Sequence, residues 1–154
     1  MGNRNCERFR KFYRAQVAEI HTLLERYVKE QSTSFDVEKY LKLCEQLGEE
    51  PDLSKMPLDA SVFPEEVQVA FFIFSLLPDR WDGMSGMYMG KDWSAANFLF
   101  DTYEIENPKD VVYFAKLYEN IVVNYKAEEQ ERRRKQEERK AKSGGKQYTH
   151  NVQR

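Results

Sequence analysis

The sequence predicts an all-α protein: a single compact bundle of about five helices, with the last helix extended as a charged, solvent-exposed helix and a flexible tail. Two observations indicate this class. Apolar residues recur at spacings of three and four along most of the chain, which is the period of a helix that packs on one face. Glycine and proline separate these stretches, and no stretch shows the alternation of apolar and polar residues typical of a strand.

The first two helices are expected at residues 7–29 and 37–47. Both stretches carry apolar side chains at helical spacing, with charged residues between them. A polar break at residues 31–34 separates them, and Gly48 offers a natural C-terminal cap for the second. We therefore expect the pair to form a helical hairpin, followed by an ordered loop over residues 49–63.

The third helix is expected to begin at Pro64 and to end before Pro78, because proline is tolerated in a first turn but cannot continue a helix. Its apolar residues occupy every side, so it should lie at the centre of the core, surrounded by the others. A loop rich in glycine and methionine follows at residues 78–92. Asp92 can then cap a fourth helix that runs to about Tyr103.

The fifth helix has the clearest apolar stripe. It begins at Pro108, keeps apolar residues at helical spacing to Tyr125, where packing is expected to end, and continues without them through residues 126–142. Acid-first charge pairs four residues apart support the charged run as a helix, each by about 0.2 to 0.5 kcal/mol. The chain thus divides into a helical core domain (1–125), a charged helical extension (126–142) and a flexible tail (143–154).

The predicted core combines the apolar stripes of these helices. Its members are Phe12, Ile20, Leu41, Cys44, Phe71, Ile73, Phe74, Phe98, Phe114, Tyr118 and Ile121. The chain has two cysteines and no apolar signal segment at its start, so a cytoplasmic location with reduced thiols is expected. The longest near-continuous apolar stretch, residues 67–77, is far shorter than the roughly 20 residues of a membrane span, so no membrane partner is expected.

Charge is segregated along the chain. Residues 1–125 carry 14 basic and 21 acidic groups, whereas residues 126–154 carry 10 and 5, and residues 36–110 alone carry 6 and 16. An acidic middle repels nucleic acid and anionic membranes, so any polyanion binding must fall to the ends. The candidate polyanion-binding residues are Arg132, Arg133, Arg134, Lys135, Arg139 and Lys140. Glutamates between them dilute their charge, which favours a simple solvated helix.

No catalytic, cofactor-binding or metal site is expected. The glycine-rich stretch at residues 86–91 has three residues between its glycines where a phosphate-binding loop has four, and Asp92 follows where that loop requires Ser or Thr. The three aspartates of the loop at residues 78–92 lack the spacing of a calcium site. The two histidines, His21 and His150, are far apart in sequence. Without a nucleophile, a base and an orienting residue, the sequence predicts a non-enzymatic protein.

The loop at residues 78–92 supplies most of the candidate partner-binding residues. Methionine adapts its shape and aromatic rings supply large contact areas, so a loop rich in both can form a groove for a protein partner. The alternative, which we favour, is that these side chains fold back and close one end of the core. In the tail, two apolar residues are spaced as in a short docking peptide. The candidates are Trp81, Met84, Met87, Tyr88, Met89, Trp93, Tyr148 and Val152.

Part of the chain resembles a group of phage proteins. The stretch at residues 43–93, which includes VFPEEVQVAFFIFSLLPDRWDGMSGMYMGKDW, and the closing SGGKQYTHNV resemble small uncharacterised helical proteins of tailed, chiefly marine, bacteriophages. That group has no motif with an established chemical role, so no functional residues follow from the resemblance. It implies a phage setting, in which small helical proteins serve as assembly chaperones, neck or tail components, or modulators of host machinery.

Three functions are therefore open. The first expectation is a protein interaction or assembly factor, whose acidic body binds one protein partner while the basic extension and tail reach another. The second is a nucleic-acid-associated regulator that uses the basic C-terminal helix. The third is an oligomeric structural subunit of a virion. The sequence leaves the oligomeric state open, as well as the choice between host cytoplasm and virion.

Overall fold

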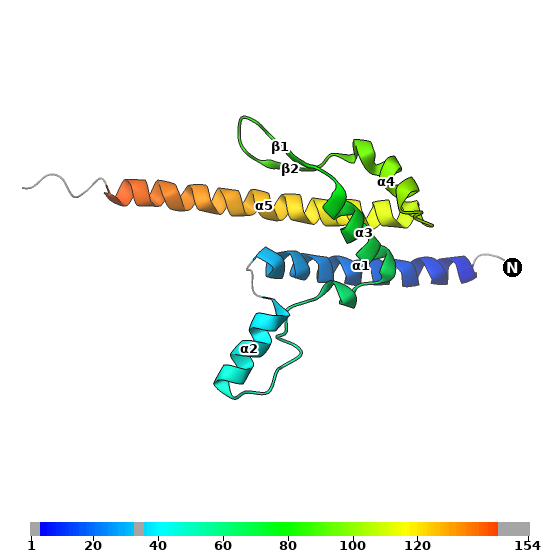
Figure 1. Ribbon diagram of the computed structural model, residues 1–154, viewed down its shortest axis with the longest axis horizontal. Helices are drawn as coiled ribbons and strands as arrows, with labels where there is room; N and C mark the ends of the chain where they lie inside the picture. The colour runs from blue at the N-terminus through cyan, green and yellow to red at the C-terminus, as the bar shows by residue number, and fades with distance from the viewer. Residues whose placement is uncertain (1–3, 33–35, 145–154) are drawn as a thin grey trace, which may run out of the picture.

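The structure, a computed structural model, describes residues 4–32 and 36–144, and within these the side chains of residues 14–32 and 36–142. The described part is mostly helical, as predicted, and also contains a small two-stranded sheet (Figure 1). The helices are α1 (Arg4–Ser32), α2 (Val37–Leu47), α3 (Glu65–Leu76), α4 (Ala96–Thr102) and α5 (Pro108–Gly144). Short 3-10 turns are η1 (Ala60–Val62) and η2 (Trp93–Ala95), and the strands are β1 (Asp79–Trp81) and β2 (Tyr88–Lys91).

The predicted helices form close to their expected bounds. α2 is capped at both ends as the sequence suggests: the Asp36 carboxylate accepts a hydrogen bond from the Lys39 N–H at 2.9 Å, and Gly48 ends the helix with a φ of +68°. The fourth helix is the one that differs. Its expected first turn is the 3-10 turn η2, which Asp92 caps through the Ser94 N–H, and only Ala96–Thr102 is α-helical.

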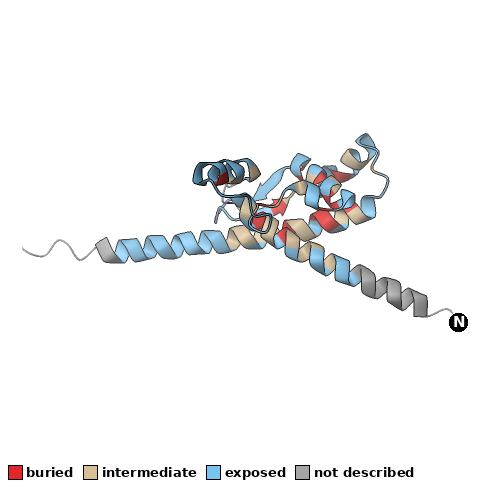
Figure 2. Cartoon of the chain, turned by 90° about the horizontal axis from the view of Figure 1, so that it is seen from below, coloured by how far each residue is buried: buried red, intermediate tan, exposed pale blue. Residues whose placement is uncertain are grey.

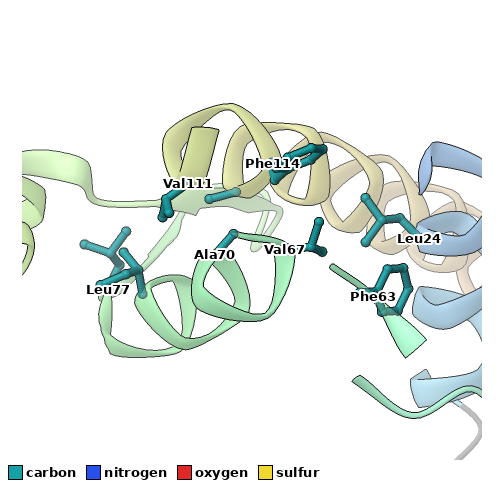
Figure 3. Packing of buried hydrophobic residues seen from close by; sticks show 9 residues of the cluster. Leu24, Phe63, Val67, Ala70, Leu77, Val111 and Phe114 are labelled. Carbon is teal, nitrogen blue, oxygen red and sulfur yellow. The ribbon is translucent and has the colours of Figure 1, made fainter. Parts of the chain in front are cut away.

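The core lies where α1, α3 and α5 meet (Figure 3). Leu24 of α1 and Val67 and Ile73 of α3 are fully buried, and the cluster is completed from α5 by Val111, Phe114 and Ala115. Burying an aliphatic side chain of this size contributes about 1.5 to 3 kcal/mol. These three helices therefore carry most of the hydrophobic stabilisation, and they fix the frame on which the remaining elements are mounted.

The predicted core residues fall into three groups. Four are buried, as predicted: Cys44, Ile73, Phe74 and Phe114. Four more are partly buried against the cluster: Ile20, Phe71, Tyr118 and Ile121. The prediction was wrong for Leu41 and Phe98, which are 42% and 70% exposed, and the side chain of Phe12 lies outside the described residues.

The predicted helical hairpin of the first two helices does not form. α2 leaves the end of α1 and points away from the rest of the molecule (Figure 1), so Leu41 on its apolar stripe faces solvent. What contacts α2 is the loop that follows it, because Tyr40 exchanges hydrogen bonds with the backbone of Asp52. The predicted central position of α3 is also only partly right, because Phe72 and Leu76 on its outer side are 44% and 40% exposed.

The molecule is elongated, which differs from the compact bundle that the sequence predicts. α1 and α5 run in the same general direction (Figure 1). They are offset along that direction, because the hydroxyl of Ser32, at the end of α1, lies 2.6 Å from that of Tyr125, near the middle of α5. The second half of α5 therefore continues past the end of α1, where its residues are exposed (Figure 2). Packing on α5 nevertheless does not end at Tyr125 as predicted, because the β-hairpin contacts Lys126 and Gln130.

Candidate functional site

The β-hairpin is the most distinctive feature of the surface, and it was not predicted. β1 and β2 pair antiparallel with Asp79 opposite Lys91 and Trp81 opposite Tyr88, and a bulge lies between Arg80 and Trp81. Strands of three and four residues are too short to display an alternating pattern, so the apolar periodicity of the chain does not predict them. A two-stranded hairpin is at best marginally stable by itself, so contacts with the helices must hold it in place.

One buried carboxylate fastens the hairpin to α5. Glu119 is 7% exposed, and its oxygens accept hydrogen bonds from the Lys91 backbone N–H at 2.6 Å, from the Trp93 indole N–H at 3.0 and 3.2 Å, and from the Lys116 ammonium at 2.7 Å. The Lys116 ammonium also lies 4.2 Å from the centre of the Trp93 ring. Glu119 thus joins the end of β2 and the start of η2 to the middle of α5.

Gly90 lets β2 approach Glu119 closely. Its φ is +93°, a conformation that side chains disfavour, and a Cβ atom built there would lie 2.6 Å from the Glu119 Oε1 atom. The absence of a side chain at position 90 is therefore what allows the carboxylate to reach the Lys91 N–H. Glu119 and Gly90 work as one contact between the hairpin and the helix.

The electrostatics of this contact follow from its hydrogen bonds. Burial raises the pKa of Glu119, but the hydrogen bonds from Lys116, Lys91 and Trp93 outweigh burial, so the net pKa lies below its ordinary value of 4.5. At the other strand, the salt bridge from Lys91 at 2.8 Å is the main cause of a lowered pKa at Asp79. Both carboxylates are therefore ionised in the folded protein at neutral pH.

Acid should loosen the hairpin through Glu119. Because its folded-state pKa is below its unfolded-state pKa, its contribution is fully present above the unfolded-state value and is lost as pH falls through the folded-state value. We expect the free energy of unfolding to fall more steeply between about pH 5 and pH 3 in the natural protein than in Glu119→Gln. Urea titrations at several pH values measure this, with Glu128→Gln on the same helix as the control. Equal slopes in all three proteins would contradict the assignment.

The far end of the hairpin is also fixed. The Asp82 carboxylate accepts hydrogen bonds from the Met84 N–H at 3.2 Å and from the Ser85 N–H and hydroxyl, and the Gly86 N–H donates to the Asp82 carbonyl at 2.8 Å. The tip rests on α5, because the Gln130 side-chain amide donates to the Ser85 carbonyl at 3.1 Å. The turn is therefore held internally and against the helix.

Between the two ends, an aromatic pair contacts the start of the charged extension. The rings of Trp81 and Tyr88 meet edge to face at 5.1 Å, and the Lys126 ammonium lies 3.9 Å from the centre of the Tyr88 ring and 5.3 Å from that of Trp81. Such cation–π contacts contribute about 0.5 to 1 kcal/mol at exposed sites. Tyr88 itself is buried, and burial is the main reason why its pKa is raised.

The hairpin presents four apolar side chains to solvent, which we call the hairpin surface. They are Trp81, Met84, Met87 and Met89, with exposed fractions of 57, 99, 39 and 55%. Along β2, Tyr88 and Gly90 are buried while Met89 is exposed, as expected when one side of a strand packs on a helix. The favoured expectation, that this loop closes the core, is thus right for Tyr88 and Trp93 and wrong for the four residues of the hairpin surface.

Two hollows flank the hairpin where it crosses α5. Gln130 and Arg134 contribute to both of them. The first is lined by Ser85 and Met87 with helix residues Asn124, Ala127, Glu128 and Glu131. The second is lined by Trp81, Gly86 and Tyr88 with helix residues Lys126, Glu129, Arg133 and Glu137. The structure thus brings two of the candidate polyanion-binding residues, Arg133 and Arg134, beside the hairpin.

The other basic candidates are exposed along α5. Arg132, Lys135 and Arg139 are spaced by three and four residues and share a face, whereas Arg133 and Arg134 lie on other sides of the helix. Acidic partners accompany them: Lys135 pairs with Glu131 at 2.6 Å, and Arg134 approaches Glu138 at 3.8 Å. The remaining candidate, Lys140, is exposed like the others.

Two candidate partner-binding residues are not described by the structure, and the described residues form neither a metal site nor a membrane span. Tyr148 and Val152 lie outside the described residues. Within the described ranges, no three His, Cys, Asp or Glu side chains come together as a metal site, and no helix is long and apolar enough to cross a membrane. Comparison with protein-family models, with curated proteins and with solved structures found no match for this chain.

The residue that sequence reasoning missed is Glu119. A signal was present, because Val111, Ala115 and Glu119 are spaced by four on the buried side of the fifth helix. A glutamate on an apolar stripe needs buried hydrogen-bond donors, since burying a charge without partners is costly. That position could have indicated a polar contact with another element, although not with which one.

Proposed function

We propose that this protein is a non-enzymatic interaction or assembly factor, and that the hairpin surface is where its body binds a protein partner. The observation that carries the proposal is that one element combines exposed apolar side chains with hydrogen bonds that anchor it to α5. Four large apolar side chains are exposed on a hairpin that is fixed at its base by Glu119 and at its tip by Gln130. A hairpin backbone that is already held in place loses little conformational entropy on binding, which leaves more of the contact energy for affinity.

The chemistry of these side chains also suits protein recognition. Tryptophan is enriched among the residues that dominate binding energies, and methionine adapts to irregular partner surfaces. Exposed apolar side chains that occur singly need no explanation, but four on one short hairpin are a concentrated feature. In this proposal the basic extension carries the tail outward to a further contact. The resemblance to phage proteins suggests virion assembly or modulation of host machinery as the setting.

Introducing negative charge on the hairpin surface tests the proposal. We expect Met84→Asp combined with Met89→Asp to weaken capture of the partner at least about tenfold, because interface anchors of this kind contribute about 1 to 2 kcal/mol each. The measurement is quantitative mass spectrometry of proteins retained by the tagged chain in its native host, followed by titration of the main partner. Phe98→Asp, at another exposed apolar residue, is the matched control. An identical retained set in all three chains would overturn the proposal.

Nucleic-acid binding by α5 is the second candidate. It has less support, because Arg134 and Lys135 have glutamate partners and further glutamates lie between the basic residues along the helix. An electrostatic nucleic-acid site concentrates positive charge on one surface. The proposed order of functions is therefore protein binding first and nucleic-acid binding second.

A further inference from the structure

A second apolar surface lies at the opposite end of the core, between α1, η1 and the start of α5. Here Ile20, Val62 and Phe114 line a groove of about 420 Å³, which is completed on α1 by Val17 and Leu23. Val62 is 54% exposed although it is a core-sized aliphatic residue. A volume of this order accommodates a few side chains of a short peptide.

The rim of this groove is acidic. Glu19, Glu66 and Asp110 come from three different elements, and no basic side chain among the described residues lines the groove. An apolar floor with an acidic rim suits a basic peptide that carries one or two apolar side chains. Such a peptide should have no acidic residue, because a like charge at the rim would be repelled.

One segment of this chain has that chemistry. Residues 145–154, GKQYTHNVQR, contain two basic residues and no acidic residue. Their two large apolar residues, Tyr148 and Val152, are four apart, so they point to the same side of the segment when it is extended. The tail is therefore complementary to the groove in charge, and it carries two apolar residues that the apolar floor of the groove can accept.

The tail cannot reach the groove of its own chain. α5 is one unbroken helix, and the 30 residues from Phe114 to Gly144 span about 45 Å. Val152 follows Gly144 by eight residues, which reach about 28 Å when fully extended. The unbroken helix thus keeps the groove and the tail apart within one molecule.

We infer that the groove of one copy binds the C-terminal tail of a second copy of this chain. The inference rests on the role of the tail as a docking peptide in the proposed function, and it names the target of that peptide. Reciprocal exchange of tails between two copies closes a dimer, whereas exchange in one direction builds longer assemblies.

Sedimentation of the full-length chain tests the inference. We expect concentration-dependent association in the natural protein and loss of association in the tail variant Tyr148→Ala/Val152→Ala. The groove variant Glu19→Lys/Glu66→Lys should associate at least about fivefold more weakly, because it replaces two rim attractions by repulsions. Glu25→Lys, an exposed glutamate on the same helix but outside the groove, should associate as the natural protein does.

Mixing variants gives the sharper outcome. The tail variant retains an intact groove and the groove variant retains an intact tail, so the mixture should form a complex that neither forms alone. A natural protein that stays monomeric at all accessible concentrations, or a tail variant that associates normally, would overturn the inference. The Met84→Asp/Met89→Asp variant should associate normally. If the natural protein does not self-associate but still captures its partner through the hairpin surface, the binding of the tail to the groove is wrong and the proposed function stands.

Discussion

Replacing Glu119 by alanine should lower the free energy of unfolding by about 2 to 4 kcal/mol, a large effect for a chain of this size. The substitution removes the acceptor for the Lys91 N–H and the Trp93 indole N–H, and it leaves the Lys116 ammonium beside the Trp93 ring without its carboxylate. Donors that lose their partner inside a protein retain their desolvation cost. The loss should therefore exceed the value of an ordinary surface ion pair.

In Glu119→Ala the hairpin should also loosen while the rest of the protein remains folded. With Glu119 absent, the base of the hairpin loses the hydrogen bonds that Glu119 makes to it from α5, while the core of α1, α3 and α5 is untouched. Both tryptophans, Trp81 and Trp93, lie in or next to the hairpin, so their fluorescence reports its position directly. We expect a red shift in the folded state of Glu119→Ala, together with faster hydrogen exchange in β2.

Chemical denaturation followed by tryptophan fluorescence and by circular dichroism measures both parts. Glu128→Ala serves as the matched control, because Glu128 is an exposed glutamate on the same helix. Its stability should change by less than about 0.5 kcal/mol. If the two variants are equally stable, Glu119 does not hold the hairpin, and the anchoring of the hairpin on which the proposed function depends loses its support.

The helical part of the fold could be predicted because it rests on local signals. The stripe of the fifth helix, the cap at Gly48 and the prolines at positions 64, 78 and 108 each act within a few residues, and each acts as expected. Where an amphipathic stripe packs is not a local property. Leu41 lies on a genuine apolar stripe, but α2 leaves the body and exposes it.

The candidate site was predicted in part. The loop at residues 78–92 drew attention through its methionines and aromatic residues, and four of these form the hairpin surface. Its secondary structure could not be predicted, because the pairing depends on Glu119, which lies 28 residues beyond Lys91 in the sequence. A contact of that range leaves no periodic pattern in either segment. The conformation of the hairpin is thus set by the helix beneath it.

Alanine at position 90 should have the second large effect, and the glycines of the hairpin provide an internal series that separates its causes. At Gly83 a Cβ atom meets nothing within 4 Å, so alanine should be nearly neutral. At Gly86 the surroundings are equally open but φ is +65°, so alanine should cost the strain of that conformation, about 1 to 2 kcal/mol. At Gly90 an alanine would have both the backbone strain and a steric clash with Glu119, so it should lower the free energy of unfolding by about 2 to 4 kcal/mol.

The contact part of the Gly90→Ala effect depends on what the Cβ atom displaces. The nearest atom is a carboxylate oxygen at the end of a side chain, which could rotate away at little cost if it were free. Here three donors hold the two oxygens of the Glu119 carboxylate, so moving the carboxylate breaks the same hydrogen bonds that Glu119→Ala removes. The two substitutions should therefore not be additive.

A double-mutant cycle measured by urea denaturation tests this expectation. In the Glu119→Ala background, Gly90→Ala should cost only the backbone strain seen at Gly86, and the difference from its cost in the natural protein is the coupling energy. Full additivity would show that Gly90 and Glu119 stabilise the hairpin independently, which their geometry argues against.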